Sequence, residues 1–72
     1  MIYNEPKYKI NNGKKELRFD HYKVEEKGNN FYGVYDRCGI LITHRDTFKQ
    51  ASKIAKLLEE AFIEGYNSWY FM

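Results

Sequence analysis

The stretch TFKQASKIAKLLEEAFIE, residues 47–64, decides the fold because it carries the clearest periodic pattern in the chain. At about 100° per residue, its apolar side chains fall on one side of a helix that runs roughly from Phe48 to Glu64. Charged residues, Glu59 and Glu60 among them, fall on the opposite side, where we expect solvent, and Ile63 is the one apolar residue clearly on that side. The apolar side is formed by Phe48, Ala51, Ile54, Ala55, Leu58, Ala61 and Phe62.

The helix start is better marked than its end. Thr47 is placed to act as the N-cap, and Gln50 three positions later completes a capping box. Gly65 is a plausible C-terminal cap because glycine readily adopts the left-handed turn that ends many helices. The end stays open, since Tyr66 and Trp69 would keep the apolar side if the helix continued.

Two turn-forming segments before the helix predict antiparallel strands. Lys27–Asn30 and Asp36–Gly39 are rich in turn residues, and Phe31–Asp36 between them alternates as a strand. Ile40–His44 follows as the next strand, apolar on both sides at its start. Connections this short favour hairpins, because a parallel pair needs a long crossover.

The segment upstream of these strands has a broken pattern. Leu17 and Phe19 share one side of a strand, whereas Tyr22 and Val24 share the other. We therefore expect a bulge or break near Asp20 and His21. The well-paired part should run from about His21 to Glu26. The fold class is therefore α+β: a three-stranded antiparallel sheet followed by one C-terminal amphipathic helix (βββα). Residues 8–10 form a possible extra short N-terminal strand, and residues 1–7 are expected to be frayed.

Composition limits the function. The 72 residues allow one small domain, with 12 Lys and Arg against 10 Asp and Glu spread evenly over both halves. This evenness counts against nucleic-acid binding, although folding can still segregate the charges. The N-terminus has no signal-peptide pattern, and no apolar run approaches the length of a membrane span. The lone Cys38, expected as a buried or half-buried thiol, fits a reducing compartment. We therefore expect a cytoplasmic protein that does not enter a membrane.

Catalytic and metal-binding patterns are weak. The two histidines, His21 and His44, show no ligand spacing with the carboxylates, and Gly28, Gly33 and Gly39 follow no phosphate-binding pattern. Gly33, inside a strand, indicates a bulge or a close backbone approach. We therefore expect no enzyme, no cofactor and no metal site.

Large apolar side chains on both sides of the expected strands predict a homodimer, since one helix covers only one face of a sheet. The alternative is that the C-terminal tail folds back over the second face. The candidate dimer or partner interface consists of Phe31, Tyr35, Ile40, Ile42, Ile63, Trp69, Tyr70 and Phe71.

Nucleic acid is a second possible partner. In element order the chain resembles the small arm-binding domains of some phage and transposon integrases, which implies that strand residues enter a DNA groove. The candidate nucleic-acid face consists of Arg18, Lys23, Arg37 and Arg45, with Tyr22 or Tyr32 between them.

The chain resembles the Yopt-like family of small prophage-encoded proteins of Bacillus type. The resemblance rests on the run Phe31–Gly39 leading to Thr47–Ala51, on the size of the chain and on its strand order. The resemblance implies three strands, one helix and a homodimer, and it supplies no site residues. The leading prediction is a non-enzymatic phage or prophage accessory protein that acts by macromolecular interaction as a homodimer. The alternative is a DNA-binding regulatory protein that uses the three-stranded sheet.

Overall fold

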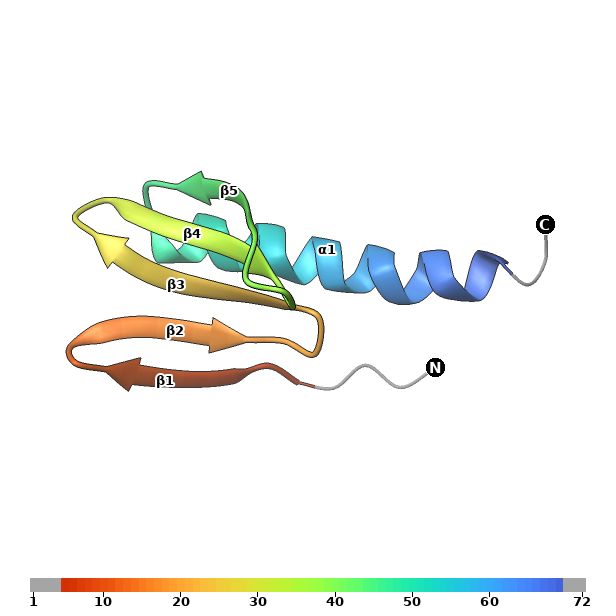
Figure 1. The fold of residues 1–72 in the computed structure, drawn as a ribbon, viewed down its shortest axis with the longest axis horizontal. Coiled ribbons are helices and arrows are strands. Elements are labelled where there is room, and N and C mark those ends of the chain that lie inside the picture. Colours follow the sequence, from red (N-terminus) through yellow and green to blue (C-terminus); the bar gives the residue numbers. More distant parts are fainter. Residues whose placement is uncertain (1–4, 70–72) are drawn as a thin grey trace.

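The computed structural model describes residues 5–69, and for residues 66–69 it describes the backbone only. An antiparallel sheet precedes one helix (Figure 1), and the five strands are ordered as they occur in the chain. The strands are β1 (Lys7–Asn11), β2 (Lys14–Arg18), β3 (Tyr22–Gly28), β4 (Phe31–Asp36) and β5 (Leu41–Arg45), and the helix is α1 (Phe48–Trp69). The predicted α+β order is confirmed, but the described sheet has five strands instead of three.

The two additional strands come from the N-terminal third of the chain. The possible strand at residues 8–10 is real and lies within β1. The expected irregularity near Asp20 and His21 is a complete chain reversal, in which Phe19 N–H donates to the carbonyl oxygen of Tyr22 at 2.7 Å. The reversal pairs Leu17 with Val24, so both side chains face the same way despite their opposite positions in the alternation.

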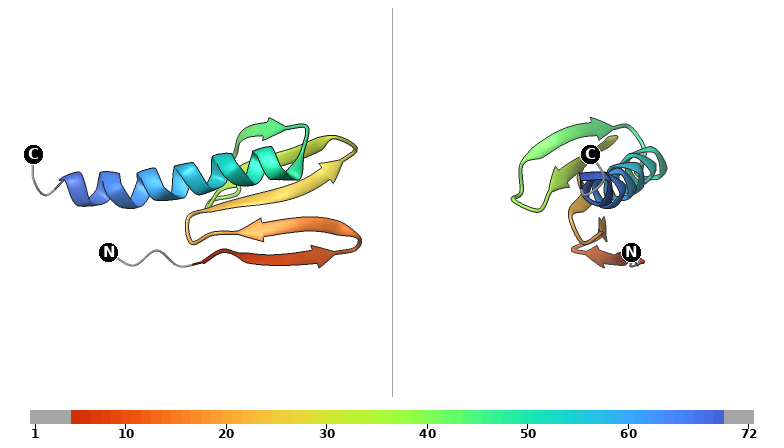
Figure 2. Two further views of the ribbon diagram at one scale, coloured as in Figure 1. Left: turned by 180° about the vertical axis from the view of Figure 1, so that it is seen from behind. Right: turned by 90° about the vertical axis from the view of Figure 1, so that its right-hand side faces the viewer.

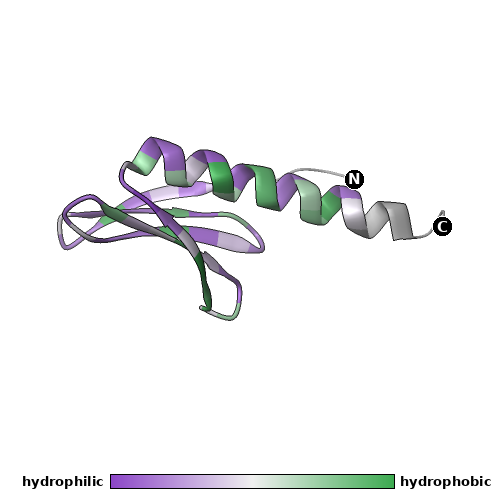
Figure 3. Ribbon diagram, turned by 90° about the horizontal axis from the view of Figure 1, so that it is seen from above, coloured by the Kyte–Doolittle hydropathy of each residue, from purple (hydrophilic) through white to green (hydrophobic). Residues whose placement is uncertain are grey.

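The helix lies across one face of the sheet, and the sheet curves around it (Figure 2). Seen from above, α1 lies over the strands and extends past their end (Figure 3). The buried core between the two layers consists of Phe19, Val24, Val34, Ala51 and Ala55. The opposite face of the sheet is left without a covering layer among the described residues.

The start of the helix matches its sequence signal, and its end does not. Thr47 Oγ1 accepts a hydrogen bond from Gln50 N–H at 3.2 Å, as expected for an N-cap. The helix continues through Gly65 to Trp69, past the expected end near Glu64, so Gly65 does not act as a C-terminal cap and the longer of the two helix ends left open is the one present. A glycine inside a helix costs only about 1 kcal/mol relative to alanine, which continued backbone hydrogen bonding can offset.

Both predicted turns are present. Asn30 has a positive φ of 57° between β3 and β4, and Gly39 has a φ of 85° between β4 and β5. In the second turn, Asp36 Oδ1 accepts hydrogen bonds from Cys38 N–H and Ile40 N–H. Cys38 is exposed in this turn, which corrects the expectation of a buried or half-buried thiol.

The bounds of two segments differ slightly from the prediction. β5 runs from Leu41 to Arg45, one residue later at each end than the predicted strand Ile40–His44. Lys7 already belongs to β1, and residues 1–4 of the segment expected to fray lie outside the described residues. The register between β4 and β5 shifts between Val34 and Tyr35, which brings Leu41 opposite Tyr35.

Candidate nucleic-acid interface

The face of the sheet that α1 leaves uncovered, here called the open face, is rich in cations. Strand alternation and register assign to it six cationic side chains and two carboxylates. The formal net charge of the whole chain is only +2, so folding concentrates positive charge here and leaves the remainder net negative. These residues are Lys7, Lys9, Lys14, Arg18, Lys23 and Lys27, with Glu16 and Glu25.

Three of the cations form one line across neighbouring strands. Lys7 of β1 pairs with Arg18 of β2, and Arg18 pairs with Lys23 of β3. Neighbouring strands lie about 4.8 Å apart, so this basic row spans about 10 Å between its outer Cα atoms. Tyr35 and Leu41 continue the same line on β4 and β5.

The two carboxylates hold cations in place without neutralising the face. Glu16 lies 4.0 Å from Lys9 Nζ and 3.9 Å from an Arg18 guanidinium nitrogen. Glu25 lies 3.1 Å from Lys23 Nζ and 2.8 Å from Lys27 Nζ. Each carboxylate is thus shared between two cations, and the face keeps an excess of positive charge.

The same contacts change the proton affinity of Glu25 and Lys27. Hydrogen bonding to Lys27 is the largest cause that lowers the pKa of Glu25 below its ordinary value, and Lys23 adds to the effect against an opposing contribution from burial. The hydrogen bond to Glu25 raises the pKa of Lys27 in turn. Both groups therefore stay charged at neutral pH.

Aromatic side chains occupy the other part of the open face, on β4 and β5. A Cβ atom added to Gly33 would lie 2.7 Å from Tyr35 Cε2, so the Tyr35 ring lies directly against the glycine backbone. This is the close approach expected for a glycine inside a strand. The Phe31 and His44 rings are stacked, with centroids 4.5 Å apart. We call Phe31, Tyr35 and His44 the aromatic strip.

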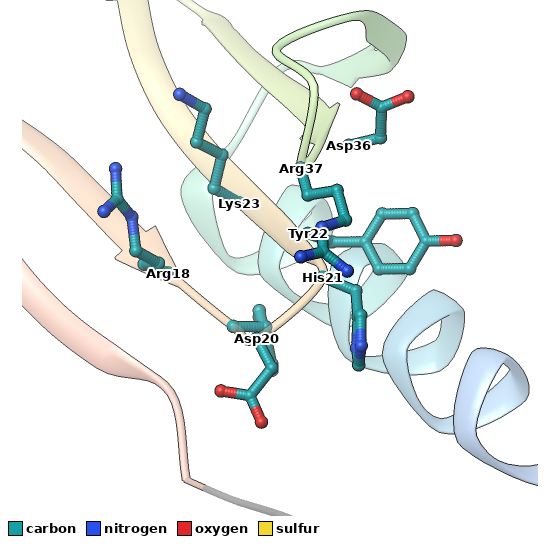
Figure 4. Close-up of a pocket in the computed structure, with 8 residues that line it drawn as sticks. Arg18, Asp20, His21, Tyr22, Lys23, Asp36 and Arg37 are labelled. Carbon is teal, nitrogen blue, oxygen red and sulfur yellow. The ribbon is translucent and has the colours of Figure 1, made fainter.

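The structure brings together three of the four residues predicted for nucleic acid. Arg18, Lys23 and Arg37 line one pocket of about 280 Å³, where β2 ends and β3 begins. Figure 4 shows Arg18 and Lys23 extending in the same direction from neighbouring strands, with Asp20 pointing away from them. Arg45 is separate, because its guanidinium donates to Thr43 Oγ1 and to the carbonyl oxygen of His44 on β5.

The two tyrosines proposed to lie between these cations are on the helix side of the sheet and not on the open face, so that part of the prediction is wrong. Tyr32 contacts Phe48 of α1 edge to face, and Tyr22 contacts Phe62 in the same way. Their strand positions share the side of Val24 and Val34, which face the core. Tyr35, which was assigned to the dimer interface, is the tyrosine that accompanies the basic row.

The residues predicted for a dimer interface come from three elements, and the side chains of five of them are described. Phe31 and Tyr35 lie on the open face, Ile40 and Ile42 are exposed beside and within the edge strand β5, and Ile63 is half-buried on α1. Trp69 is the last residue of α1, and its side chain lies outside the described residues, as do Tyr70 and Phe71.

A buried carboxylate that sequence reasoning missed joins the helix to the β2–β3 turn. Glu59, expected in solvent, is only 2% exposed and accepts a hydrogen bond from His21 N–H at 2.9 Å. Its second oxygen lies 2.5 Å from His21 Nδ1, and the His21 ring stacks on Phe62. On the helical wheel Glu59 lies only 80° from Ala51, at the border of the apolar side. That border position is the only sequence signal for its burial.

Two further observations concern residues 5–69. They contain no cluster of three or more histidine, cysteine, aspartate or glutamate side chains able to hold a metal ion. No helix among them has the length and apolar character needed to cross a membrane.

The chain matches no protein-family model, and no curated protein or solved structure is significantly similar to it. The resemblance to the Yopt-like family therefore stays a prediction.

Proposed function

We propose that the protein binds nucleic acid through the open face of its sheet. The observation that carries this proposal is the basic row, in which Lys7, Arg18 and Lys23 from three successive strands face the same uncovered side. Clustered lysine and arginine on one face is the electrostatic footprint of a phosphate-binding surface. The even charge distribution along the sequence was the main argument against this function. That argument loses its force because six of the cationic side chains share one face of the folded sheet.

The ion pairs on the open face are compatible with phosphate binding. Arg18 and Lys9 have side chains about 60% exposed, and their contacts with Glu16 are long, at 3.9 and 4.0 Å. Exposed pairs of this kind contribute little to stability, so the cations can exchange a carboxylate for a phosphate at small cost. Contacts to phosphate release condensed counterions, and binding is therefore expected to weaken steeply as salt concentration rises.

The test is a fluorescence-anisotropy titration of labelled oligonucleotides at several salt concentrations. The double variant Arg18→Gln/Lys23→Gln removes two cations of the basic row. The matched control Lys49→Gln/Lys53→Gln removes the same charge from exposed positions of α1. Circular dichroism before titration establishes that both variants are folded.

We expect the wild-type protein and the control to bind at low salt with a similar salt dependence. Each phosphate contact contributes about 0.7–0.9 to the slope of log affinity against log salt, so the row variant should lose roughly 1.5 from that slope. Absence of binding by the wild-type protein at low salt, or equal losses in both variants, would show that the open face is not the binding surface.

Exposed apolar residues favour a second candidate, a homodimer that acts through protein interaction. Ile40 and Ile42 are 64% and 45% exposed, and β5 is an edge strand of the sheet. Exposed apolar side chains on a sheet edge are suited to pairing with another chain. A phage or prophage accessory role for such a dimer rests on the family resemblance alone.

Sedimentation velocity tests this second candidate. A dimer at high micromolar concentration that dissociates in the variant Ile42→Lys would support pairing through β5. A monomer at that concentration would exclude the homodimer, and it would leave the nucleic-acid proposal unaffected.

A further inference from the structure

The aromatic strip lies beside the basic row on the same face, and this arrangement restricts the kind of nucleic acid that fits. We infer that the preferred ligand is a single strand, with phosphates on β1–β3 and bases stacked on the aromatic strip. The inference rests on the proposed function, because it presupposes that the open face binds nucleic acid. Within a duplex the faces of the bases are already stacked on one another, whereas a single strand leaves them available to aromatic side chains.

Tyr35 is the best-placed stacking residue. One side of its ring lies against Gly33, where any side chain larger than hydrogen would collide with it. Lys23 Nζ and Lys27 Nζ lie 5.9 and 5.6 Å from the ring centroid. Both lysines belong to the cations of the open face, so the phosphate-binding groups and the ring are direct neighbours. When the ammonium groups turn to phosphates, the outer side of the ring becomes free for a base.

Phe31 and His44 provide a second aromatic position further along the strip. Phe31 lies near the start of β4, and His44 is paired with Gly33 in the register of β4 and β5. The strip therefore runs along β4 and β5 while the cations occupy β1–β3. A single strand carries charged phosphates along one side and bases with exposed flat faces along the other. This division matches the arrangement of cations and aromatic rings on the open face.

Electrostatics alone predicts the opposite preference. A duplex carries more charge per unit length than a single strand, so a purely cationic face would bind the duplex at least as tightly. A preference for the single strand is therefore diagnostic of stacking. Alanine substitution at a stacking residue lowers affinity by roughly 5- to 150-fold per base, and we expect a loss in this range for Tyr35.

The experiment compares binding of an oligothymidylate of about 12 nucleotides, within the usual site size, with binding of a duplex of the same length. The variants are Tyr35→Leu, which keeps apolar bulk but has no aromatic ring, and Tyr35→Phe, which keeps the ring. Tyr8→Leu is the matched control, because Tyr8 is 52% exposed but lies on the helix side of the sheet. Thermal denaturation of each variant shows whether it is folded at the assay temperature.

We expect tighter binding of the single strand, a roughly 5-fold or larger loss in Tyr35→Leu, and near wild-type affinity in Tyr35→Phe and Tyr8→Leu. Equal or tighter duplex binding together with an unaffected Tyr35→Leu variant would overturn this inference and leave the proposed function intact. Failure to bind either oligonucleotide at low salt would overturn both.

Discussion

The variant Glu59→Ala tests the buried link between α1 and the β2–β3 turn. Glu59 is 2% exposed, accepts a hydrogen bond from the backbone N–H of His21, and shares a second hydrogen bond with Nδ1 of the His21 ring. The substitution removes both bonds and leaves the backbone N–H without its acceptor. A bond to a charged group contributes about 1.5–3 kcal/mol, and an orphaned buried donor costs about 1–3 kcal/mol, so we expect a loss of about 2–4 kcal/mol.

This loss is large for so small a domain. At about 0.05–0.15 kcal/mol per residue, a chain of this length has a total stability of roughly 4–10 kcal/mol. The melting temperature should therefore fall by about 8–32 °C, because 1 kcal/mol corresponds to about 4–8 °C in domains of this size. Glu59→Gln should lose less, since its amide oxygen can still accept the bond from His21 N–H.

The assay is urea denaturation followed by circular dichroism, with thermal melting as a second measurement. Glu60→Ala, one position along the same helix, is the matched control, and it should change stability by no more than about 0.5 kcal/mol. A Glu59→Ala protein as stable as this control would refute the reasoning, because it would mean that the buried carboxylate contributes nothing to the fold.

Three further predictions follow from single contacts. Gly33→Ala places a methyl group 2.7 Å from the Tyr35 ring, and it should displace the ring and alter the near-ultraviolet circular dichroism, at a cost below the roughly 1–3 kcal/mol of an over-packed core because the ring can turn on the open face; an unchanged spectrum would contradict the close packing. Because Lys27 lowers the pKa of Glu25 in the folded state, the ionised carboxylate adds stability above its unfolded pKa of about 4.3, and this contribution is lost as pH falls through the lower folded pKa. Urea denaturation should accordingly show Glu25→Gln less stable than wild type near neutral pH, with the difference shrinking below about pH 4, and a constant difference would refute the linkage. Thr47→Ala removes the N-cap acceptor for Gln50 N–H, and thermal melting should show a loss of about 1 kcal/mol; a gain would show that the cap is not formed.

Local signals in the sequence were sufficient for the helix start and for β4. The N-cap at Thr47 and the aromatic-rich run Phe31–Asp36 between two turn-forming segments depend only on residues close in the chain, and both agree with the structure. The strand β2 was missed because Leu17 is its only apolar residue, which is too little for a recognisable alternation. β2 can be recognised as a strand only once the chain reversal after Phe19 is known, because that reversal places β2 beside its partner β3.

The candidate site depends on long-range geometry that the sequence does not display. Arg18 and Lys23 were recognised as cations of the sheet, but their alignment with Lys7 requires the register of three strands. The burial of Glu59 likewise depends on His21, which lies far away in the chain. An even distribution of charge along the sequence therefore concealed a strongly uneven distribution on the folded surface.

The most direct test of the central claim, nucleic-acid binding by the open face, is an NMR titration of the labelled protein with an oligonucleotide. Amide shifts identify the contacted surface without any substitution. The account predicts saturable shifts in β1–β3 around Arg18 and Lys23, extending to Tyr35, with little change in the first part of α1. Shifts confined to α1 or to β5, or no shifts at low salt, would contradict it.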